Sequence, residues 1–178
     1  MEYVALTDQQ LSYLARQDPN LKRVFYGTVP CDGLPKSPIT NKPRAYIVNT
    51  DPHNQPGQHW IALWTENNVC EVMDSYALPL DFYSQAKPLK EWVLNKWKYV
   101  VTNGKSLQGL PSQACGHYAL LYLIMKAKGQ TLQDFLQMFS DYNRVNNDHR
   151  VGEMLKQIIH SNVEDLPFGG RQTCKSRL

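Results

Sequence analysis

The chain has 178 residues, of which 42% are hydrophobic and 20% are charged. This length predicts one domain, and this composition excludes intrinsic disorder, collagen-like chains and coiled coils. No apolar run approaches the ~20 residues that cross a bilayer, and the first residues lack the basic and apolar regions of a signal peptide. We therefore expect an intracellular globular protein with no membrane partner.

The net charge of +3 comes almost entirely from the end of the chain. Without residues 171–178, 16 basic and 16 acidic side chains remain, so the global charge does not indicate a protein that coats nucleic acid. The range Ala86–Lys105 is a local exception, because it combines a net charge of +4 with aromatic residues. It is either a DNA-binding surface or the solvated face of an amphipathic helix. Its lysines are Lys87, Lys90, Lys96, Lys98 and Lys105.

The N-terminal half predicts one helix followed by a sheet. The helix covers Thr7–Gln17 and begins with the capping-box pair Thr7 and Gln10. The range Val29–Pro43 is so rich in proline and glycine that it permits only an extended loop. Turn residues then separate three segments rich in Val, Ile, Tyr and Trp, which predict the strands Arg44–Asn49, His59–Thr65 and Asn68–Ser75.

The C-terminal half predicts mainly helices. Ala86–Trp97 has helical periodicity, and Lys98–Thr102 predicts a further strand. Three helices follow in succession: Gly116–Lys128, Thr131–Tyr142 and Asp148–Ser161. Because the strands precede the helices, we expect an α+β fold, with one domain over residues 1–166 and a flexible basic tail over 167–178.

Cysteine usage points to one residue. In a chain of this size, scattered cysteines without a CxxC pair predict mostly free thiols. A loop with Gly and Pro leads into Cys115, and the apolar block 119–125 follows it. This places the thiol in the first turn of a buried helix, where backbone N–H groups and the helix dipole favour a nucleophilic thiolate. The alternative is a small buried residue that opens a core helix. The cysteines are Cys31, Cys70, Cys115 and Cys174.

A cysteine nucleophile needs a general base, and the chain has five histidines. His117 lies roughly 200° around the same helix from Cys115, so it cannot face the thiol. His59 precedes a strongly apolar strand and is the best candidate. The others fall in a turn-rich loop or in or near the last predicted helix: His53, His149 and His160.

The strand of His59 and the next strand are joined by a short turn, which sets their register. One two-residue turn places Asp74 directly opposite His59. The other, centred on Asn67 and Asn68, places Tyr76 there and Asp74 at the diagonal position on the same face. Either turn brings imidazole and carboxylate together, whereas a three-residue loop would separate them. The pair would orient a base for thiol chemistry or, alternatively, form a cross-strand surface contact.

Acyl transfer also needs hydrogen-bond donors for the developing oxyanion. Gln108 lies seven residues before Cys115, across a Gly/Pro loop that can fold back over the thiol. The backbone N–H of Cys115 is a second candidate donor. Gln113 is nearer in sequence and would serve as a helix cap or a substrate contact.

The motifs His59-Trp60, Asp74, Gln108-Gly109 and Cys115-Gly116 together resemble the adenovirus protease (adenain) family of cysteine endopeptidases. The resemblance covers roughly residues 58–128, and the interval from Gln108 to Cys115 is its most specific feature. The order His, acid, Cys is shared with the wider clan that includes the SUMO proteases. The chain is similar in length to the compact enzymes of adenoviruses and of related Polinton and adintovirus elements.

The resemblance implies an α+β fold with a circularly rearranged papain-like core, in which helices flank an antiparallel-rich sheet. It implies that Cys115 is the nucleophile, His59 the base, Asp74 its orienting group and Gln108 the oxyanion donor, with no cofactor or metal required. The implied substrates are capsid or virion precursor proteins cut after glycine, in the virion and the host nucleus or cytoplasm. A groove too narrow for a Cβ beside the thiol would select glycine. We expect substrate contacts from Trp60, Gln113 and Gly116.

The sequence departs from that family in its means of activation. Adenovirus enzymes are stimulated by DNA and by a basic peptide that forms a disulfide with a cysteine between the acid and the glutamine. Residues 75–107 contain no cysteine. The tail instead carries a Gly-Gly pair before a basic, cysteine-bearing segment. Either the enzyme cuts itself near Gly169 or Gly170 and the tail becomes an activator or tether, or the tail is a frayed terminus.

Two other functions stay open. An isopeptidase that removes ubiquitin-like proteins would use the same chemistry at Gly-Gly termini. A non-catalytic module that binds nucleic acid or capsid would use the range Ala86–Lys105. A metal site is disfavoured, because His53, His59 and Cys70 lack a recognised ligand spacing. We expect the protein to be a monomer.

Overall fold

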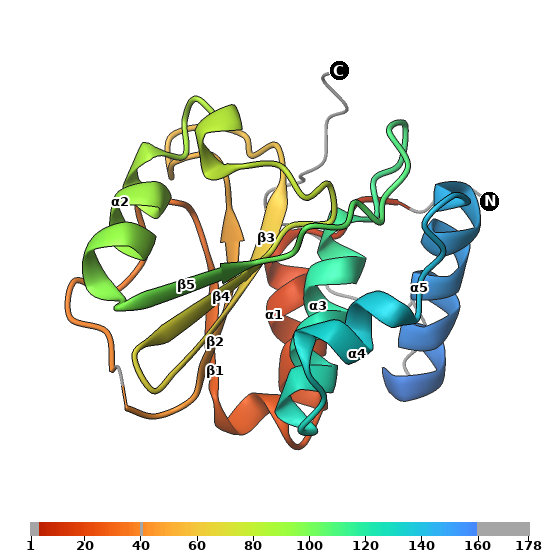
Figure 1. Ribbon diagram of the computed structural model, residues 1–178, viewed down its shortest axis with the longest axis horizontal. Helices are drawn as coiled ribbons and strands as arrows, with labels where there is room; N and C mark the ends of the chain where they lie inside the picture. The colour runs from red at the N-terminus through yellow and green to blue at the C-terminus, as the bar shows by residue number, and fades with distance from the viewer. Residues whose placement is uncertain (1–3, 40, 160–178) are drawn as a thin grey trace.

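A mixed five-stranded sheet forms the middle layer of the protein (Figure 1). The computed structural model describes residues 4–39 and 41–159. The strands lie in sequence order across the sheet, as β1 (Phe25–Val29), β2 (Arg44–Asn49), β3 (Trp60–Glu66), β4 (Val69–Met73) and β5 (Tyr99–Thr102). The central pairs β2–β3 and β3–β4 are antiparallel, whereas the edge pairs β1–β2 and β4–β5 are parallel. The antiparallel pairs therefore form the centre of the sheet. They are equal in number to the parallel pairs, whereas the resemblance implied a sheet rich in antiparallel pairs.

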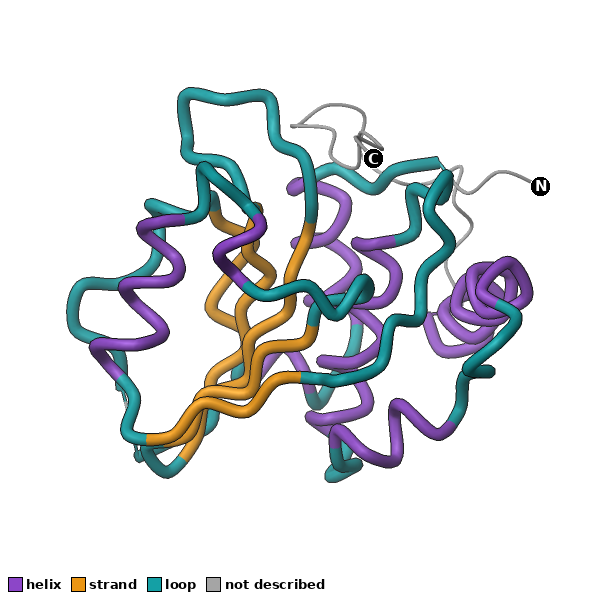
Figure 2. The backbone as a smooth tube through the Cα atoms, turned by 45° about the horizontal axis from the view of Figure 1, so that its top comes forward, coloured by secondary structure: helices purple, strands orange, loops and turns teal. Residues whose placement is uncertain are grey.

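Helices cover both faces of the sheet, which confirms the mixed fold class (Figures 1 and 2). One face carries α2 (Lys87–Lys96) and the short 3-10 helix η2 (Leu80–Phe82). The other face carries the remaining helices, with α3 packed directly on β3. These are α1 (Asp8–Gln17), α3 (Cys115–Ala127), α4 (Leu132–Gln137) and α5 (Arg144–Ile159), and the short 3-10 helix η1 (Leu21–Arg23) follows α1.

Alternating side chains of the central strands enter two separate apolar cores. On β3, Trp60, Ala62 and Trp64 face the core under α1 and α3, whereas Ile61 and Leu63 face the core under α2. This alternation follows from the period of two in a β-strand. Because every one of these residues is buried, β3 is fixed on both faces and provides a rigid base for the residue that precedes it, His59.

Local signals in the sequence predicted most elements to within a turn. The capping box of Thr7 and Gln10 is present, with hydrogen bonds in both directions. The helix predicted to begin at Gly116 starts one residue earlier, so Cys115 is itself its first residue. The helix predicted over Thr131–Tyr142 ends at Gln137. Ser161, the predicted end of the last helix, lies outside the described residues.

Two predictions of local structure were wrong. The strand β1 was not expected, although its sequence FYGTV has the aromatic and β-branched residues of a strand and ends at Pro30. The last helix begins at Arg144 rather than Asp148, because the side chain of Asn143 accepts a hydrogen bond from the backbone N–H of Asn146 at 3.0 Å. The earlier start places Asp148 in the second turn of α5.

Within residues 4–39 and 41–159, no helix is long and apolar enough to cross a membrane. The predicted tail 167–178, with Gly169 and Gly170, lies outside the described residues.

We predict that Leu120→Ala destabilises the protein by about 2–5 kcal/mol, because Leu120 on α3 is completely buried and alanine would leave a cavity. Urea denaturation followed by circular dichroism measures the free energy of unfolding. Leu94→Ala on α2 is the matched control, since Leu94 is 57% exposed and its loss should cost less than about 0.5 kcal/mol. Equal effects of the two substitutions would show that α3 is not the central core helix.

Candidate active site

The ends of three strands meet at one end of the sheet, and α3 begins nearby (Figure 2). Because β3 and β4 are antiparallel, β3 begins where β4 ends, and β5 ends there too because it is parallel to β4. His59 immediately precedes β3 and Asp74 immediately follows β4. Residues far apart in the sequence are thereby brought to the same end of the molecule.

Cys115 is the first residue of α3 and is buried. Within the turn before it, the backbone N–H of Ala114 donates a hydrogen bond of 3.1 Å to Ser112 Oγ. The sequence predicted free thiols, and Cys31 and Cys70 are free, but Cys115 is disulfide-bonded. Chemistry at this sulfur therefore concerns the reduced protein.

The strand that follows His59 lies against the first turn of α3. A Cβ added to Gly116 would lie 3.2 Å from Cδ1 of Trp60 and 3.3 Å from a methyl group of Leu11. Such distances are tighter than an ordinary van der Waals contact, so the absence of a side chain at position 116 permits this close approach. Since Trp60 follows His59 and Gly116 follows Cys115, the contact joins the segments that carry the expected base and nucleophile.

His59 and Asp74 form a buried hydrogen bond, with 2.7 Å between His59 Nε2 and Asp74 Oδ1. The observed pair Ala62–Met73 identifies the turn as the one centred on Asn67 and Asn68. Both turn residues have positive φ, 50° and 63°, as the favoured two-residue hairpin turn requires. In this register Asp74 is the diagonal neighbour of His59, which is one of the two arrangements that the sequence predicted.

Four donors surround the carboxylate of Asp74, which is only 2% exposed. Besides His59, these are the backbone N–H groups of Tyr76 and Leu78 and the hydroxyl of Tyr83, the last at 2.6 Å. Burial acts to raise the pKa of Asp74, but the charge of His59 and these hydrogen bonds together hold that pKa below its ordinary value. Asp74 is therefore ionised near neutral pH and fixes the orientation of the imidazole.

Two tyrosines hold the His59 ring by stacking, of which the sequence placed Tyr76 opposite His59 in one register and gave no indication of Tyr83. The ring centroids of Tyr76 and Tyr83 lie 5.0 and 5.3 Å from that of His59, with interplanar angles of 25° and 14°. Tyr76 follows from the hairpin register, which places it opposite His59. No local pattern indicates Tyr83, which arrives from the segment after η2.

Asn103 fixes the backbone of Asp74 and was also missed. Its Oδ1 accepts the N–H of Asp74 at 2.8 Å, and its Nδ2 donates to the carbonyl of Asp74 at 2.6 Å and to that of Lys105 at 3.0 Å. Asn103 follows the last residue of β5, and its side chain takes the place of further strand pairing with β4. The sequence Asn103-Gly104 indicated only a turn.

Gln108 is completely buried and is attached to the residues that follow Asp74. Its Oε1 accepts the hydroxyl of Ser75 at 2.6 Å, and its Nε2 donates to the carbonyl of Ser112 at 2.8 Å and to the hydroxyl of Tyr76 at 3.1 Å. The structure thus joins Gln108 to the His59–Asp74 pair. Because both amide hydrogens already have acceptors, donation to an oxyanion requires that one of these bonds be exchanged.

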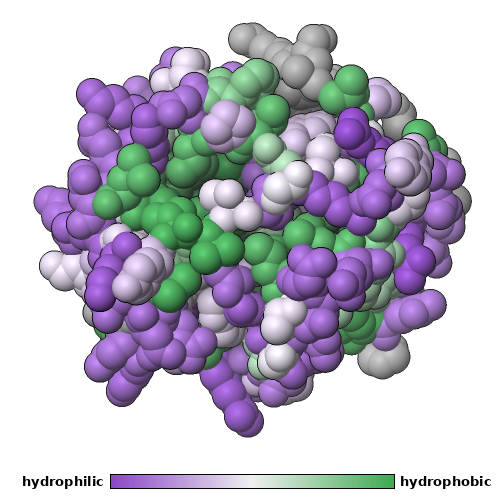
Figure 3. Space-filling model, in the orientation of Figure 1, coloured by the Kyte–Doolittle hydropathy of each residue, from purple (hydrophilic) through white to green (hydrophobic). Residues whose placement is uncertain are grey.

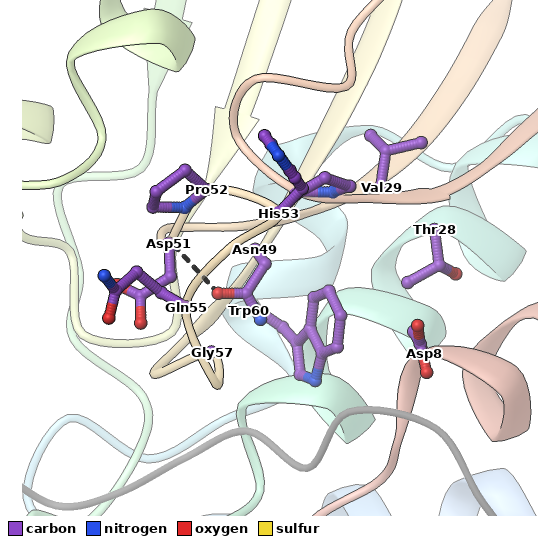
Figure 4. Close-up of a pocket in the computed structure, with 11 residues that line it drawn as sticks. Asp8, Thr28, Val29, Asn49, Asp51, Pro52, His53, Gln55, Gly57 and Trp60 are labelled. Atoms are coloured by element: carbon purple, nitrogen blue, oxygen red, sulfur yellow. Dashed lines mark hydrogen bonds between the residues drawn. The ribbon is translucent and has the colours of Figure 1, made fainter.

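The expected substrate contacts lie around the same region. Trp60 is 2% exposed, and its Nε1 donates to the carbonyl of Leu6 at 3.0 Å. One edge of its ring lines a cavity of about 250 Å³ between the β2–β3 loop and the start of α1 (Figure 4). Gln113 is exposed, and its side-chain oxygen accepts the backbone N–H of Ala5 at 3.2 Å. Gly116 is buried beneath Trp60.

The five lysines of the predicted basic surface do not act as one group. Lys87 forms an ion pair with Glu91, and Lys90 forms one with Asp81. Lys105 instead donates to the carbonyls of Leu136 and Phe139 and pairs with Asp141. Lys96 and Lys98 are exposed. Exposed apolar residues also occur on α2 and β5, namely Leu94, Tyr99, Val100 and Val101. In the view of Figure 3, hydrophobic and hydrophilic residues are interspersed over the surface.

The other described histidines lie in the β2–β3 loop, on α3 and on α5. His53 is exposed and contacts Asp32 at 2.5 Å, and His149 lies on α5. His117 lies in the first turn of α3 beside α5, and His160 is outside the described residues. Among the residues that the structure describes, no group of three His, Cys, Asp or Glu side chains could hold a metal ion.

Comparisons with known proteins leave the family open. No family model matches the sequence, and no curated protein matches it. Among solved structures, the chain is similar to ChlaDub1 from Chlamydia trachomatis, with 14% sequence identity and a TM-score of 0.41, over 92% of this chain and 81% of that one. A similarity at this level carries no argument about activity, so the function must be inferred from the site itself.

We predict that Asn103→Ala lowers the free energy of unfolding by about 1–3 kcal/mol, because it leaves the buried N–H of Asp74 without its acceptor and removes one of the two donors to the Asp74 carbonyl, the other being the N–H of Ala77. Urea denaturation measures the effect. Asn95→Ala on the exposed part of α2 makes the same chemical change and should cost less than about 0.5 kcal/mol. An Asn103→Ala protein as stable as the wild type would show that the hydrogen bonds between Asn103 and the backbone of Asp74 do not stabilise the fold.

We predict that His117 makes the free energy of unfolding depend on pH. Burial, with a smaller contribution from the charge of Lys156, lowers the pKa of His117 from 6.5 to about 4. Below pH 6.5 the unfolded chain binds a proton that the folded chain excludes until about pH 4. The stability that the neutral form of His117 contributes to the folded protein is therefore complete above pH 6.5, and it is lost as the pH falls toward 4. Between about pH 7 and about pH 5, wild type should lose about 1 kcal/mol or more relative to His117→Gln. If urea denaturation shows that wild type and His117→Gln lose the same free energy of unfolding over this pH range, the predicted effect of His117 is wrong.

Proposed function

We propose that the protein is a cysteine endopeptidase that cuts peptide bonds after glycine through an acyl-enzyme on Cys115. The observation that carries this proposal is the buried His59–Asp74 hydrogen bond beside the start of α3. Because Nε2 of His59 is bonded to Asp74, Nδ1 is the nitrogen that takes the thiol proton. The N-terminus of α3 favours the thiolate once Cys115 is reduced.

The reaction follows from these positions. His59 Nδ1 accepts the proton of Sγ, and the sulfur forms a bond to the glycyl carbonyl carbon. The amide of Gln108 and the backbone N–H of Cys115 stabilise the resulting oxyanion. The carbon–nitrogen bond then breaks, and His59 returns the proton to the leaving amine. Water, deprotonated by His59, hydrolyses the thioester, which releases the acid and regenerates the thiol.

The resemblance of the sequence motifs to adenain supports a substrate class. We propose capsid or virion precursor proteins of a virus or related element, cut during particle maturation in the virion or the host nucleus or cytoplasm. Close contact between Trp60 and Gly116 supports a narrow groove and thus a preference for glycine. Stimulation by DNA at the exposed Lys96 and Lys98, or by a basic cysteine-containing peptide, belongs to the same proposal.

We predict that the reduced protein hydrolyses fluorogenic peptides with glycine before the cleaved bond and not their alanine analogues. Cys115→Ala should lower kcat/KM by about 1,000-fold or more, and His59→Ala by about 100-fold or more. Asp74→Asn should retain partial activity. Cys70→Ala is the matched control, because Cys70 is a free, buried cysteine on β4.

Each other outcome of this assay has a definite meaning. Full activity of Cys115→Ala would disprove the proposed function. Hydrolysis of ubiquitin or SUMO fluorophore conjugates in preference to the peptides would replace the endopeptidase by an isopeptidase of the same chemistry. Absence of any hydrolysis, with DNA binding that falls steeply with salt, would favour a non-catalytic nucleic-acid module.

A further inference from the structure

The residue after Gln108 is bound by a buried carboxylate from α5. The backbone N–H of Gly109 donates to Asp148, at 3.1 Å to Oδ2 and 3.4 Å to Oδ1. On α3, the helix that begins with Cys115, the hydroxyl of Tyr118 donates to Asp148 Oδ1 at 2.9 Å. Asp148 therefore connects the residue after the expected oxyanion donor to the helix that carries the expected nucleophile.

Within the loop that follows Gly109, Ser112 joins Gln108 to the start of the nucleophile helix. Ser112 Oγ accepts the backbone N–H of Ala114, the residue before Cys115, at 3.1 Å. The carbonyl of Ser112 accepts Nε2 of Gln108 at 2.8 Å. A shift of Ser112 would therefore move both the amide of Gln108 and the backbone N–H groups at the start of α3.

The side chain at position 148 must accept hydrogen bonds at both of its terminal atoms. The backbone N–H of Gly109 and the hydroxyl of Tyr118 both donate to this side chain, which is 7% exposed. An ionised carboxylate has two acceptor oxygens, whereas an asparagine would present an NH2 group to one of these donors. Burial raises the pKa of Asp148 above its ordinary value, and hydrogen bonds, that of Tyr118 foremost, oppose this rise.

The residues next to Gly109 and Asp148 favour the hydrogen bond between them. A Cβ on Gly109 would lie 2.8 Å from Asp148 Oδ2, so only glycine permits the bond. Asn147 donates Nδ2 to the carbonyl of Leu107 at 3.1 Å, and the hydroxyl oxygen of Tyr118 lies 3.3 Å from the same carbonyl. The backbone on either side of Gln108 is thus held by α5.

We propose that Asp148 is a positioning residue for the oxyanion hole, which it builds by binding both Gly109, the residue after Gln108, and Tyr118 on the helix that begins with Cys115. The proposal rests on the proposed cysteine-peptidase function. Asp148 touches neither the substrate nor the reacting atoms. Its effect on the reaction passes through the placement of the Gln108 amide and of the N–H groups that begin α3.

The test compares three readouts in Asp148→Asn and wild type, both reduced. We expect kcat for glycyl peptide hydrolysis to fall about 10-fold or more, with KM changed less than about 3-fold, because oxyanion stabilisation acts in the transition state. A peptide aldehyde, which forms a tetrahedral oxyanion adduct, should bind about 10-fold or more weakly. Alkylation of Cys115 by iodoacetamide should keep its rate, because this reaction develops no oxyanion.

Matched variants separate positioning from general damage. Glu153→Gln on α5 makes the same change of acid to amide at an exposed ion pair and should leave all three readouts unchanged. Tyr118→Phe removes one of the two donor residues of Asp148 and should show the same pattern with a smaller loss of kcat. It keeps the proposal testable if Asp148→Asn does not fold.

The remaining outcomes each contradict a specific statement. If wild type hydrolyses peptides and Asp148→Asn has the same kcat, the positioning role is wrong and the proposed function stands. If hydrolysis and alkylation fall together in Asp148→Asn and in Tyr118→Phe, the role of Asp148 is structural only. If reduced wild type hydrolyses no glycyl peptide, the proposed function fails and the positioning role fails with it.

Discussion

The site depends on the buried carboxylate of Asp74. A charge this deeply buried is stable only where donors replace its water, and four donors do so. Because these donors come from the start of β3, the turn after β4 and the segment after η2, the carboxylate fixes their relative positions. The next two residues, Ser75 and Tyr76, then hold Gln108. One tripeptide thereby connects the base to the oxyanion donor.

Short-range patterns were sufficient for much of the fold and for one contact of the site. The capping box of Thr7 and Gln10 fixed the start of α1. The turn at Asn67 and Asn68 limited the hairpin to two registers, and both placed Asp74 on the face of His59. Side-chain alternation along a strand has a period of two, so the parity of the turn decides which residues meet. For this reason the His59–Asp74 contact could be predicted without knowledge of the tertiary fold.

The remaining contacts could not be predicted, because they join residues that only the tertiary fold brings together. Asn103 reaches Asp74 across 29 positions, and Asp148 reaches Gly109 across 39. No local periodicity identifies the partner of a buried Asn or Asp. A single polar residue in a loop or helix is therefore predicted to be exposed. The contacts of Lys105 could not be predicted for a related reason: the sequence places it at the end of the basic range, whereas its ammonium binds the carbonyl groups of Leu136 and Phe139.

The most direct measurement of the central claim is the pH dependence of thiol alkylation in the reduced protein, followed at each cysteine by peptide mass spectrometry. Cys31 and Cys70 serve as internal standards, since burial raises the pKa of Cys31 to about 11 and raises that of Cys70 further. If His59 activates the thiol, Cys115 is alkylated rapidly below pH 7 and His59→Ala abolishes this reactivity. Cys115 reactivity that appears only above about pH 8.5, as for an ordinary thiol, or that does not depend on His59, would contradict this role of His59.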